Sequence, residues 1–197
     1  MKKILLIPFI LFCATSLFAG EFSATGLKLG MHQSRFVGKD IPGKGASNIP
    51  GVAIGGFLTY NINRKIAIRQ ELFISTRGSQ INTVGDINLH NVFVYLECPL
   101  LAKYSFLPES RFGPFIFAGP DFSINLLAIN DVGMPDDIRK TDWGVIAGVG
   151  VEFWRVGLEL RFYRGLSDFD QSASGIDLKN QSFSFLFSYS FFAGGGE

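Results

Sequence analysis

The segment 180–192 limits the fold more than any other, because bulky and small residues alternate in it at almost every position (NQSFSFLFSYSFF). Consecutive side chains of a β-strand point to opposite faces. One face of this strand would carry only aromatic residues: Phe183, Phe185, Phe187, Tyr189 and Phe191. Such a face needs apolar surroundings along its whole length. A strand crosses a bilayer with roughly 9–11 residues that have one apolar and one polar face, so the segment predicts a transmembrane strand.

The N-terminus has the composition of a secretory signal peptide. Lys2 and Lys3 precede an apolar run over 4–14, and small residues follow near Ala19. This order of basic, apolar and small residues predicts a signal peptide over 1–19 and an exported domain over 20–197.

Charge and hydropathy exclude two classes of protein. The chain has 18 basic and 17 acidic residues. Without the two lysines of the signal peptide, 18 − 2 = 16 basic residues remain, so the exported chain is close to neutral and nothing recruits nucleic acid. A membrane helix needs about 20 mostly apolar residues, but the most apolar internal run, 92–104, is interrupted by Glu97 and Pro99. In hydrocarbon, a backbone satisfies its own hydrogen bonds only as a helix or a closed sheet. The chain can therefore cross a membrane only as a barrel.

Eight strand candidates follow the signal peptide. They span 22–35, 51–61, 65–77, 88–104, 113–127, 141–153, 156–168 and 181–192. Short turns at 61–64, 105–112 and 154–155 alternate with long polar loops at 36–50, 78–87, 128–140 and 169–180. The pattern predicts an all-β fold, an eight-stranded antiparallel up-and-down transmembrane β-barrel. Bacterial barrels keep short turns in the periplasm and long loops outside, so we expect both termini on the periplasmic side.

Within the strands, charged residues share one face and apolar residues the other. The inward face is expected to carry Arg69, Glu71, Glu97, Lys103, Glu152, Glu159 and Arg161. The lipid-facing side is expected to carry Phe183, Phe185, Phe187, Leu158, Leu160, Val145 and Val149. Eight strands enclose a lumen that side chains just fill, so mutually paired charges and small residues form a plausible plug. Gln70 is an exception, because it falls on the apolar face.

Aromatic residues near the strand ends match the interfacial girdles of membrane barrels. They are Trp143, Trp154, Tyr60, Tyr104, Tyr163 and Tyr189. Glycines within strands, such as Gly144, Gly148 and Gly150, are expected to relieve crowding and permit curvature.

With these strands laid out, the chain resembles the PorT-like, or porin-family, outer-membrane barrel proteins of Bacteroidetes and their relatives. The resemblance rests on the hairpin GGFLTYNINRKIAIRQELFISTRGS over 55–79 and on five further fragments in the family's order. These are YLECPLLAKYSF (95–106), GPFIFAGPDF (113–122), GVIAGVGVEF (144–153), LELRFYRGLSDF (158–169) and NQSFSFLFSYSF (180–191). The family has no shared catalytic motif, and some of its members are linked to protein secretion or gliding. The resemblance implies the cell outer membrane of a Gram-negative bacterium.

Candidate sites are few. His32 and His90 both fall near the outer rim, but no serine has the neighbourhood that a nucleophile needs, and no ligand spacing indicates a metal. We therefore expect no catalytic, cofactor or metal site, and a monomer surrounded by outer-membrane lipid.

Three functional hypotheses remain open. The first is a structural or interaction protein whose outer loops contact proteins or glycans. The second is a narrow passive channel for small solutes or ions. The third is a soluble periplasmic ligand-binding barrel with the two faces of its wall reversed.

Overall fold

The computed structural model describes residues 22–37, 46–82, 88–108, 110–130, 140–166 and 179–193. The signal peptide predicted over 1–19 and most of the predicted outer loops lie outside these residues. The described strands are β1 (Phe22–Val37), β2 (Ala46–Ser47), β3 (Ile49–Asn61), β4 (Ile66–Asn82), β5 (Asn88–Ser105), β6 (Phe112–Asn130), β7 (Thr141–Phe153), β8 (Val156–Gly165) and β9 (Lys179–Ala193).

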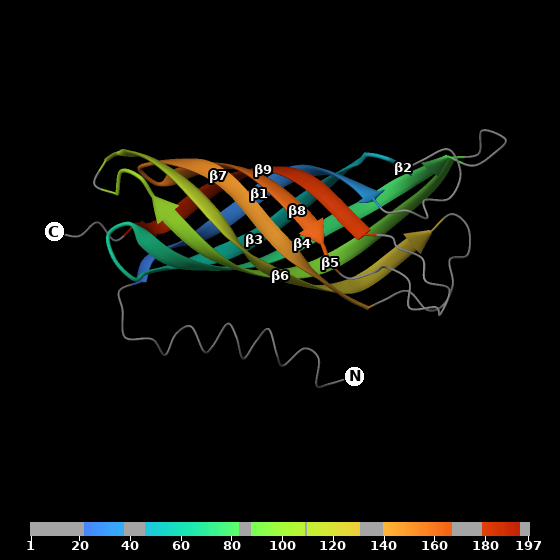
Figure 1. Ribbon diagram of the computed structural model, residues 1–197, viewed down its shortest axis with the longest axis horizontal. Helices are drawn as coiled ribbons and strands as arrows, with labels where there is room; N and C mark the ends of the chain where they lie inside the picture. Colours follow the sequence, from blue (N-terminus) through green and yellow to red (C-terminus); the bar gives the residue numbers. More distant parts are fainter. Residues whose placement is uncertain are drawn as a thin grey trace.

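Eight of these strands close into one barrel (Figure 1). Each strand from β3 to β8 pairs antiparallel with the next one in the chain. Strand β1 closes the barrel, because it pairs with β3 on one side and with β9 on the other. The predicted eight-stranded antiparallel barrel is therefore confirmed. The sequence pattern missed β2, a two-residue strand inside the expected loop 36–50, which pairs with Gln80 and Ile81 of β4.

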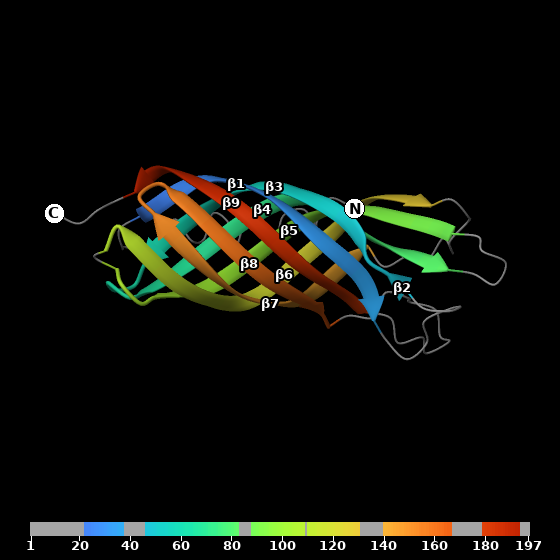
Figure 2. The same ribbon diagram turned by 90° about the horizontal axis from the view of Figure 1, so that it is seen from above.

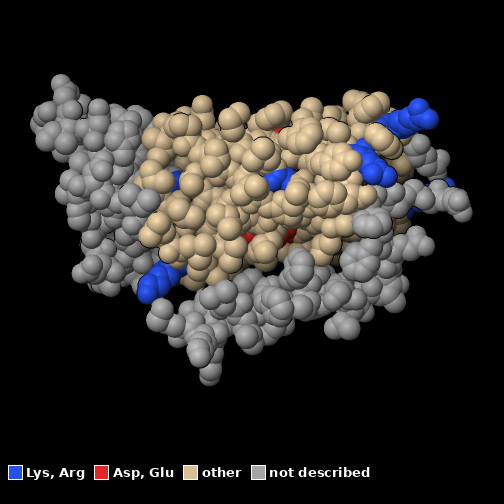
Figure 3. Space-filling view, turned by 180° about the vertical axis from the view of Figure 1, so that it is seen from behind, with Lys and Arg blue, Asp and Glu red and all other residues tan. Residues whose placement is uncertain are grey.

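The strands tilt around the barrel (Figure 2). Their pairing brings apolar side chains of neighbouring strands together on the outer wall. Leu29 of β1, for example, lies between Ile54 of β3 and Phe187 of β9. Every residue predicted to face lipid is exposed on this wall, from Leu158 at 40% to Phe183 at 61%. On the face in Figure 3, charged atoms show only as small spots between the ends of the barrel. Among the described residues, no helix is long and apolar enough to span a membrane.

The short turns share one end of the barrel with both described chain ends (Figure 1). In the β3–β4 turn, the Asn63 carboxamide oxygen accepts hydrogen bonds from the backbone N–H groups of Lys65 and Ile66, at 2.9 and 2.8 Å. In the β7–β8 turn, Trp154 adopts a φ of 55°, which a non-glycine residue rarely does outside tight turns. Short turns mark the periplasmic end of such barrels.

Gln70 departs from the alternation because it repairs a gap in the sheet. The β4–β5 ladder is interrupted next to Pro99, which has no N–H to donate. The Gln70 amide nitrogen donates instead to the carbonyl oxygens of Glu71 and Pro99, at 3.2 and 3.0 Å. The side chain is buried against the wall by these contacts, so a polar residue is tolerated on the apolar face.

Large aromatic rings also fill the interior, in addition to the charges and small residues that the sequence predicted as a plug. The buried rings include Phe57, Phe73, Phe115 and Phe117. Tyr163 was predicted to belong to an interfacial girdle, but its side chain is buried and donates a hydrogen bond to Asp142 at 2.9 Å. The prediction was wrong because the residue lies at an inward position of β8, and burial is set by the face as well as by the distance from the strand end.

Candidate functional site: the ionic interior

The structure places all seven predicted interior charges on the lumen side of the wall. Arg69 and Glu71 come from β4, Glu97 and Lys103 from β5, Glu152 from β7, and Glu159 and Arg161 from β8. Six of them are buried, and Glu152 is half-buried near the turn end. The strands bring them together because charged residues two positions apart in one strand share its inward face.

From the turn end inward, the first part of the network runs through Lys103, Glu152, Arg69 and Glu159. Glu152 accepts from Lys103 at 2.5 Å and from Arg69 at 2.7 Å. A second Arg69 nitrogen lies 2.7 Å from Glu159. The Arg69 guanidinium also lies over the rings of Phe57 and Phe115, at 5.2 and 5.3 Å, and such contacts stabilise a desolvated cation.

At the centre, two carboxylates are held by two further cations. Lys28 of β1 lies 2.5 Å from Glu71 and 2.6 Å from Glu159. Arg161 donates two hydrogen bonds to Glu71, at 2.5 and 2.8 Å, and two to Glu159, at 3.0 and 2.5 Å. Glu159 thus contacts three cations, Lys28, Arg69 and Arg161.

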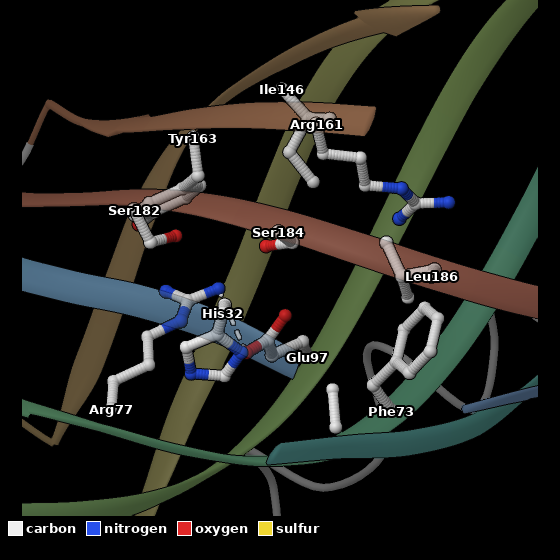
Figure 4. A pocket seen from close by; sticks show the side chains of 11 residues that line it. His32, Phe73, Arg77, Glu97, Ile146, Arg161, Tyr163, Ser182, Ser184 and Leu186 are labelled. Atoms are coloured by element: carbon white, nitrogen blue, oxygen red, sulfur yellow. Dashed lines mark ion pairs between the residues drawn. The ribbon is translucent and has the colours of Figure 1, made fainter. Parts of the chain in front are cut away.

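A second cluster lies toward the loop end and centres on Arg77 of β4 (Figure 4). Arg77 pairs with Glu97 at 2.8 Å and with Asp121 of β6 at 3.3 Å. The hydroxyl groups of Ser75 and Ser123 donate to Glu97 and Asp121 respectively. The guanidinium also lies 4.0 Å from the centroid of the Tyr163 ring.

Sequence reasoning missed three members of this network: Lys28, Arg77 and Asp121. The alternation could have found them. Arg77 lies at an even spacing from Arg69, and Lys28 lies between the inward glycines of the first strand. With these three included, the described network holds five cations and five carboxylates. The charges of these ten ion-paired groups therefore balance formally.

The space left in this interior is small. A cavity of about 30 Å³ lies between the two clusters, and His32, Arg77, Glu97 and Arg161 are among its lining residues (Figure 4). Such a volume holds about two water molecules. Side chains and paired charges occupy the lumen around it.

The structure describes the side chain of His32 but not that of His90. The His32 Nε2 atom lies 2.5 Å from the Thr76 carbonyl oxygen, so this ring nitrogen is engaged by the backbone of β4. Within the described ranges, no three His, Cys, Asp or Glu residues are grouped to hold a metal ion.

Comparison with known proteins agrees with the barrel. A model of the family described as "Outer membrane protein beta-barrel domain" matches residues 18–171. The chain belongs to this family. The protein therefore lies in the outer membrane of a Gram-negative bacterium, and the exposed wall of its barrel faces lipid. The third hypothesis, a soluble periplasmic barrel, is wrong, because the apolar face of the barrel wall points outward.

Several outer-membrane proteins of known structure have a fold similar to that of this protein. OprG from Pseudomonas aeruginosa has a TM-score of 0.56 at 15% identity, over 88% of this chain and 99% of that chain. Neisserial surface protein A has a TM-score of 0.50 at 16% identity, over 85% and 97%. The outer membrane enzyme PagL has a TM-score of 0.50 at 12% identity, over 82% and 98%. No curated protein matches the sequence. At these identities the similarity concerns the fold alone.

Proposed function

We propose that this outer-membrane protein is a closed, monomeric barrel without catalytic activity, whose role is structural or one of interaction. The role is exercised through the long connections at the outer end, where proteins or glycans at the cell surface are the partners. These connections include 38–45, 83–87, 131–139 and 167–178, which lie outside the described residues. The six sequence fragments that resemble PorT-like proteins support a role beside secretion or surface machinery.

The observation that carries the proposal is the ion-pair network across the lumen. It extends from Lys103 through Arg69 and Glu159 to Arg161, and the cavity beyond it is about 30 Å³. A hydrated solute would have to displace charges that are already paired. Eight strands provide little lumen beyond the volume of their inward side chains.

Conductance in planar bilayers tests the closed barrel against the second hypothesis, a narrow passive channel. The purified exported chain should give no steady open-pore current. Glu71→Gln and Arg161→Gln would be recorded in parallel, with the exposed Arg164→Gln as the matched control. A steady current in the wild type that either interior variant abolishes, while the control retains it, would establish the channel instead.

Photo-crosslinking on intact cells tests the role of the outer loops. A crosslinking amino acid within 131–139 or 167–178 should capture cell-surface proteins or glycans, whereas one at Ile62 in a short turn should not. The same crosslinks from both ends, or none from the loops of a correctly assembled barrel, would contradict an interaction role at the outer end.

The absence of catalysis has its own test. The Thr76 carbonyl oxygen already contacts the Nε2 atom of His32, and the Ser75 and Ser123 hydroxyls donate to carboxylates. These groups are therefore not arranged as a base and a nucleophile, which supports the proposal. Purified protein mixed with phospholipid or lipopolysaccharide should release no fatty acid. Release that His32→Gln removes would identify an enzyme.

A further inference from the structure

A polar pocket opens at the turn end of the barrel, apart from the ionic interior. Its volume is about 500 Å³, within the roughly 300–1,000 Å³ typical of small-molecule sites. All three short turns line it, and its inner side reaches Lys103 and Glu152 at the start of the ion-pair network. We call this pocket the periplasmic vestibule.

The charged residues described in the lining of the vestibule are mostly cations. Its described lining residues include five cations, Arg64, Lys65, Lys103, Arg111 and Arg155, and one carboxylate, that of Glu152. Glu152 is already bound by Arg69 and Lys103. In Figure 3, Lys and Arg side chains gather at this end of the barrel. A recess lined by charges of one sign attracts and concentrates ions of the other sign.

Backbone hydrogen bonds hold three of these basic residues in place. The carbonyl oxygen of Lys65 accepts from the Ser105 N–H at 2.8 Å, that of Arg111 from the Trp154 N–H at 3.3 Å, and that of Arg155 from the Ser190 N–H at 2.8 Å. Each of the three turns therefore has a basic residue whose main chain is bonded to another strand or turn. The backbone of these basic residues is therefore held in place before a ligand binds, so binding costs less conformational entropy.

We propose that the periplasmic vestibule binds a phosphate group. Three of its five cations are arginines, whose planar guanidinium groups donate two parallel hydrogen bonds to a phosphate. A phosphate monoester carries about −1.5 to −2 charges at neutral pH, and the phosphodiester of a phospholipid headgroup carries a single negative charge. Both suit a pocket whose described lining residues are mostly cationic.

Two sources supply such a group at this end of the barrel. One is a soluble phosphate compound in the periplasm, and the other is the headgroup of a phospholipid in the inner leaflet. Arg155 lies near the second source, because its guanidinium stacks 5.3 Å from the ring of Trp154. Trp154 is 75% exposed, as is usual for tryptophan at a membrane surface.

Isothermal titration with inorganic pyrophosphate, on the full exported chain in a non-ionic detergent, tests the soluble source. The wild type should bind, and affinity should fall as salt is added. The triple variant Lys65→Gln, Arg111→Gln, Arg155→Gln should bind at least about tenfold more weakly, since each charge-assisted hydrogen bond lost corresponds to roughly that factor. The double variant Arg35→Gln, Arg164→Gln, with exposed sites at the other end, should bind like the wild type.

Nanodiscs test the lipid source with the same proteins. Native mass spectrometry should find phosphatidylglycerol retained on the wild type and on the double variant, and lost from the triple variant. The three substituted residues of the triple variant lie on turns, and those of the double variant are exposed residues in strands β1 and β8. The backbone hydrogen bonds remain in both variants, so heat-modifiable gel migration should show all three proteins folded.

The two arms have distinct outcomes. Binding of pyrophosphate alone identifies a site for soluble phosphate compounds, and retention of the lipid alone identifies a headgroup site. The proposal is overturned if neither ligand binds the folded wild type, or if the triple variant binds both as tightly as the wild type does. These readouts concern the periplasmic end, so they stand whether or not the outer loops have the proposed interaction role.

Discussion

Glu159 is the residue on which most of the interior charge pairing converges. Its two carboxylate oxygens contact Lys28, Arg69 and Arg161, and its side chain is almost fully buried. A buried ion pair contributes little net stability when formed, because both charges lose water. Removing one partner is costly, since the other charge then stays buried without compensation.

Glu159→Gln should therefore destabilise the barrel by about 3–5 kcal/mol. The measurement is equilibrium unfolding by urea from lipid vesicles. Glu159→Gln combined with Lys28→Met removes one charge of each sign, so it should be less destabilised than the two single variants predict together. Strict additivity in this cycle would show that the Lys28–Glu159 contact does not couple the two residues.

Gln70 offers a second test at the residue scale. Gln70→Met keeps the shape but leaves the Glu71 and Pro99 carbonyls without their donor, which should cost about 1–3 kcal/mol. Adding Pro99→Val supplies a backbone N–H to the ladder and should recover part of the loss in the same urea titration. No recovery, in a double variant that still folds, would show that the gap beside Pro99 is not what makes Gln70 necessary.

Strand β7 shows how an element is shaped to its neighbours. Its glycines face inward, opposite large rings: a Cβ added to Gly148 would lie 2.4 Å from the Phe117 ring, and one added to Gly150 would lie 2.3 Å from the Phe115 ring. The small residues predicted to relieve crowding therefore leave room for aromatic side chains from β6.

Gly148→Ala should accordingly destabilise the barrel, by about 1–3 kcal/mol as overpacking usually does. Gly56→Ala in β3 is the matched control, because its new Cβ would lie 3.4 Å from the nearest atom. Combining Gly148→Ala with Phe117→Leu should recover part of the loss, because it relieves the contact with the ring but not the equally short contact with the Leu160 carbonyl oxygen. Equal stability of the Gly148 and Gly56 variants in urea would contradict a packing role for the β7 glycine.

For the molecule as a whole, the membrane decides which side of the sheet is apolar. Leu160, at 58% exposure, and the aromatic face of β9 cover the outer wall, while the ionic side chains are enclosed. In water the same arrangement would leave a broad apolar surface exposed. In lipid that surface is the stable one, and the backbone ladder has no open edge.

Leu160→Arg should destabilise the membrane-inserted barrel by about 2–4 kcal/mol, as expected for a charge near the middle of the bilayer. Ile62→Arg, on a turn at the barrel end, should cost about 0–1 kcal/mol, because a charge there reaches the interface. Unfolding from vesicles measures both. Similar costs for the two arginines would place Leu160 away from the bilayer centre.

The sequence by itself determined the eight strands of the barrel and divided the residues of each strand between two faces, but it did not reveal the two-residue strand β2. Alternation with a period of two puts apolar residues such as Phe185 on one face of their strand and charged residues such as Arg161 on one face of theirs. The mixture of both signs of charge, together with the aromatic strand at 180–192, then favoured the charged face as the inward one. The alternation also contained the signal for Lys28 and Arg77, which share the inward face of their strands.

Only the tertiary structure decided which charges meet. Lys28 bonds to Glu71 and to Glu159 across 43 and 131 residues of sequence, and this contact depends on the stagger and closure of the barrel. The same holds for the phenylalanine rings opposite the β7 glycines, for Gln70 beside Pro99, and for the three basic turns that form the periplasmic vestibule. The physical reason is that a strand's own pattern sets its two faces, whereas contacts across a lumen are set by how all eight strands shear and close together.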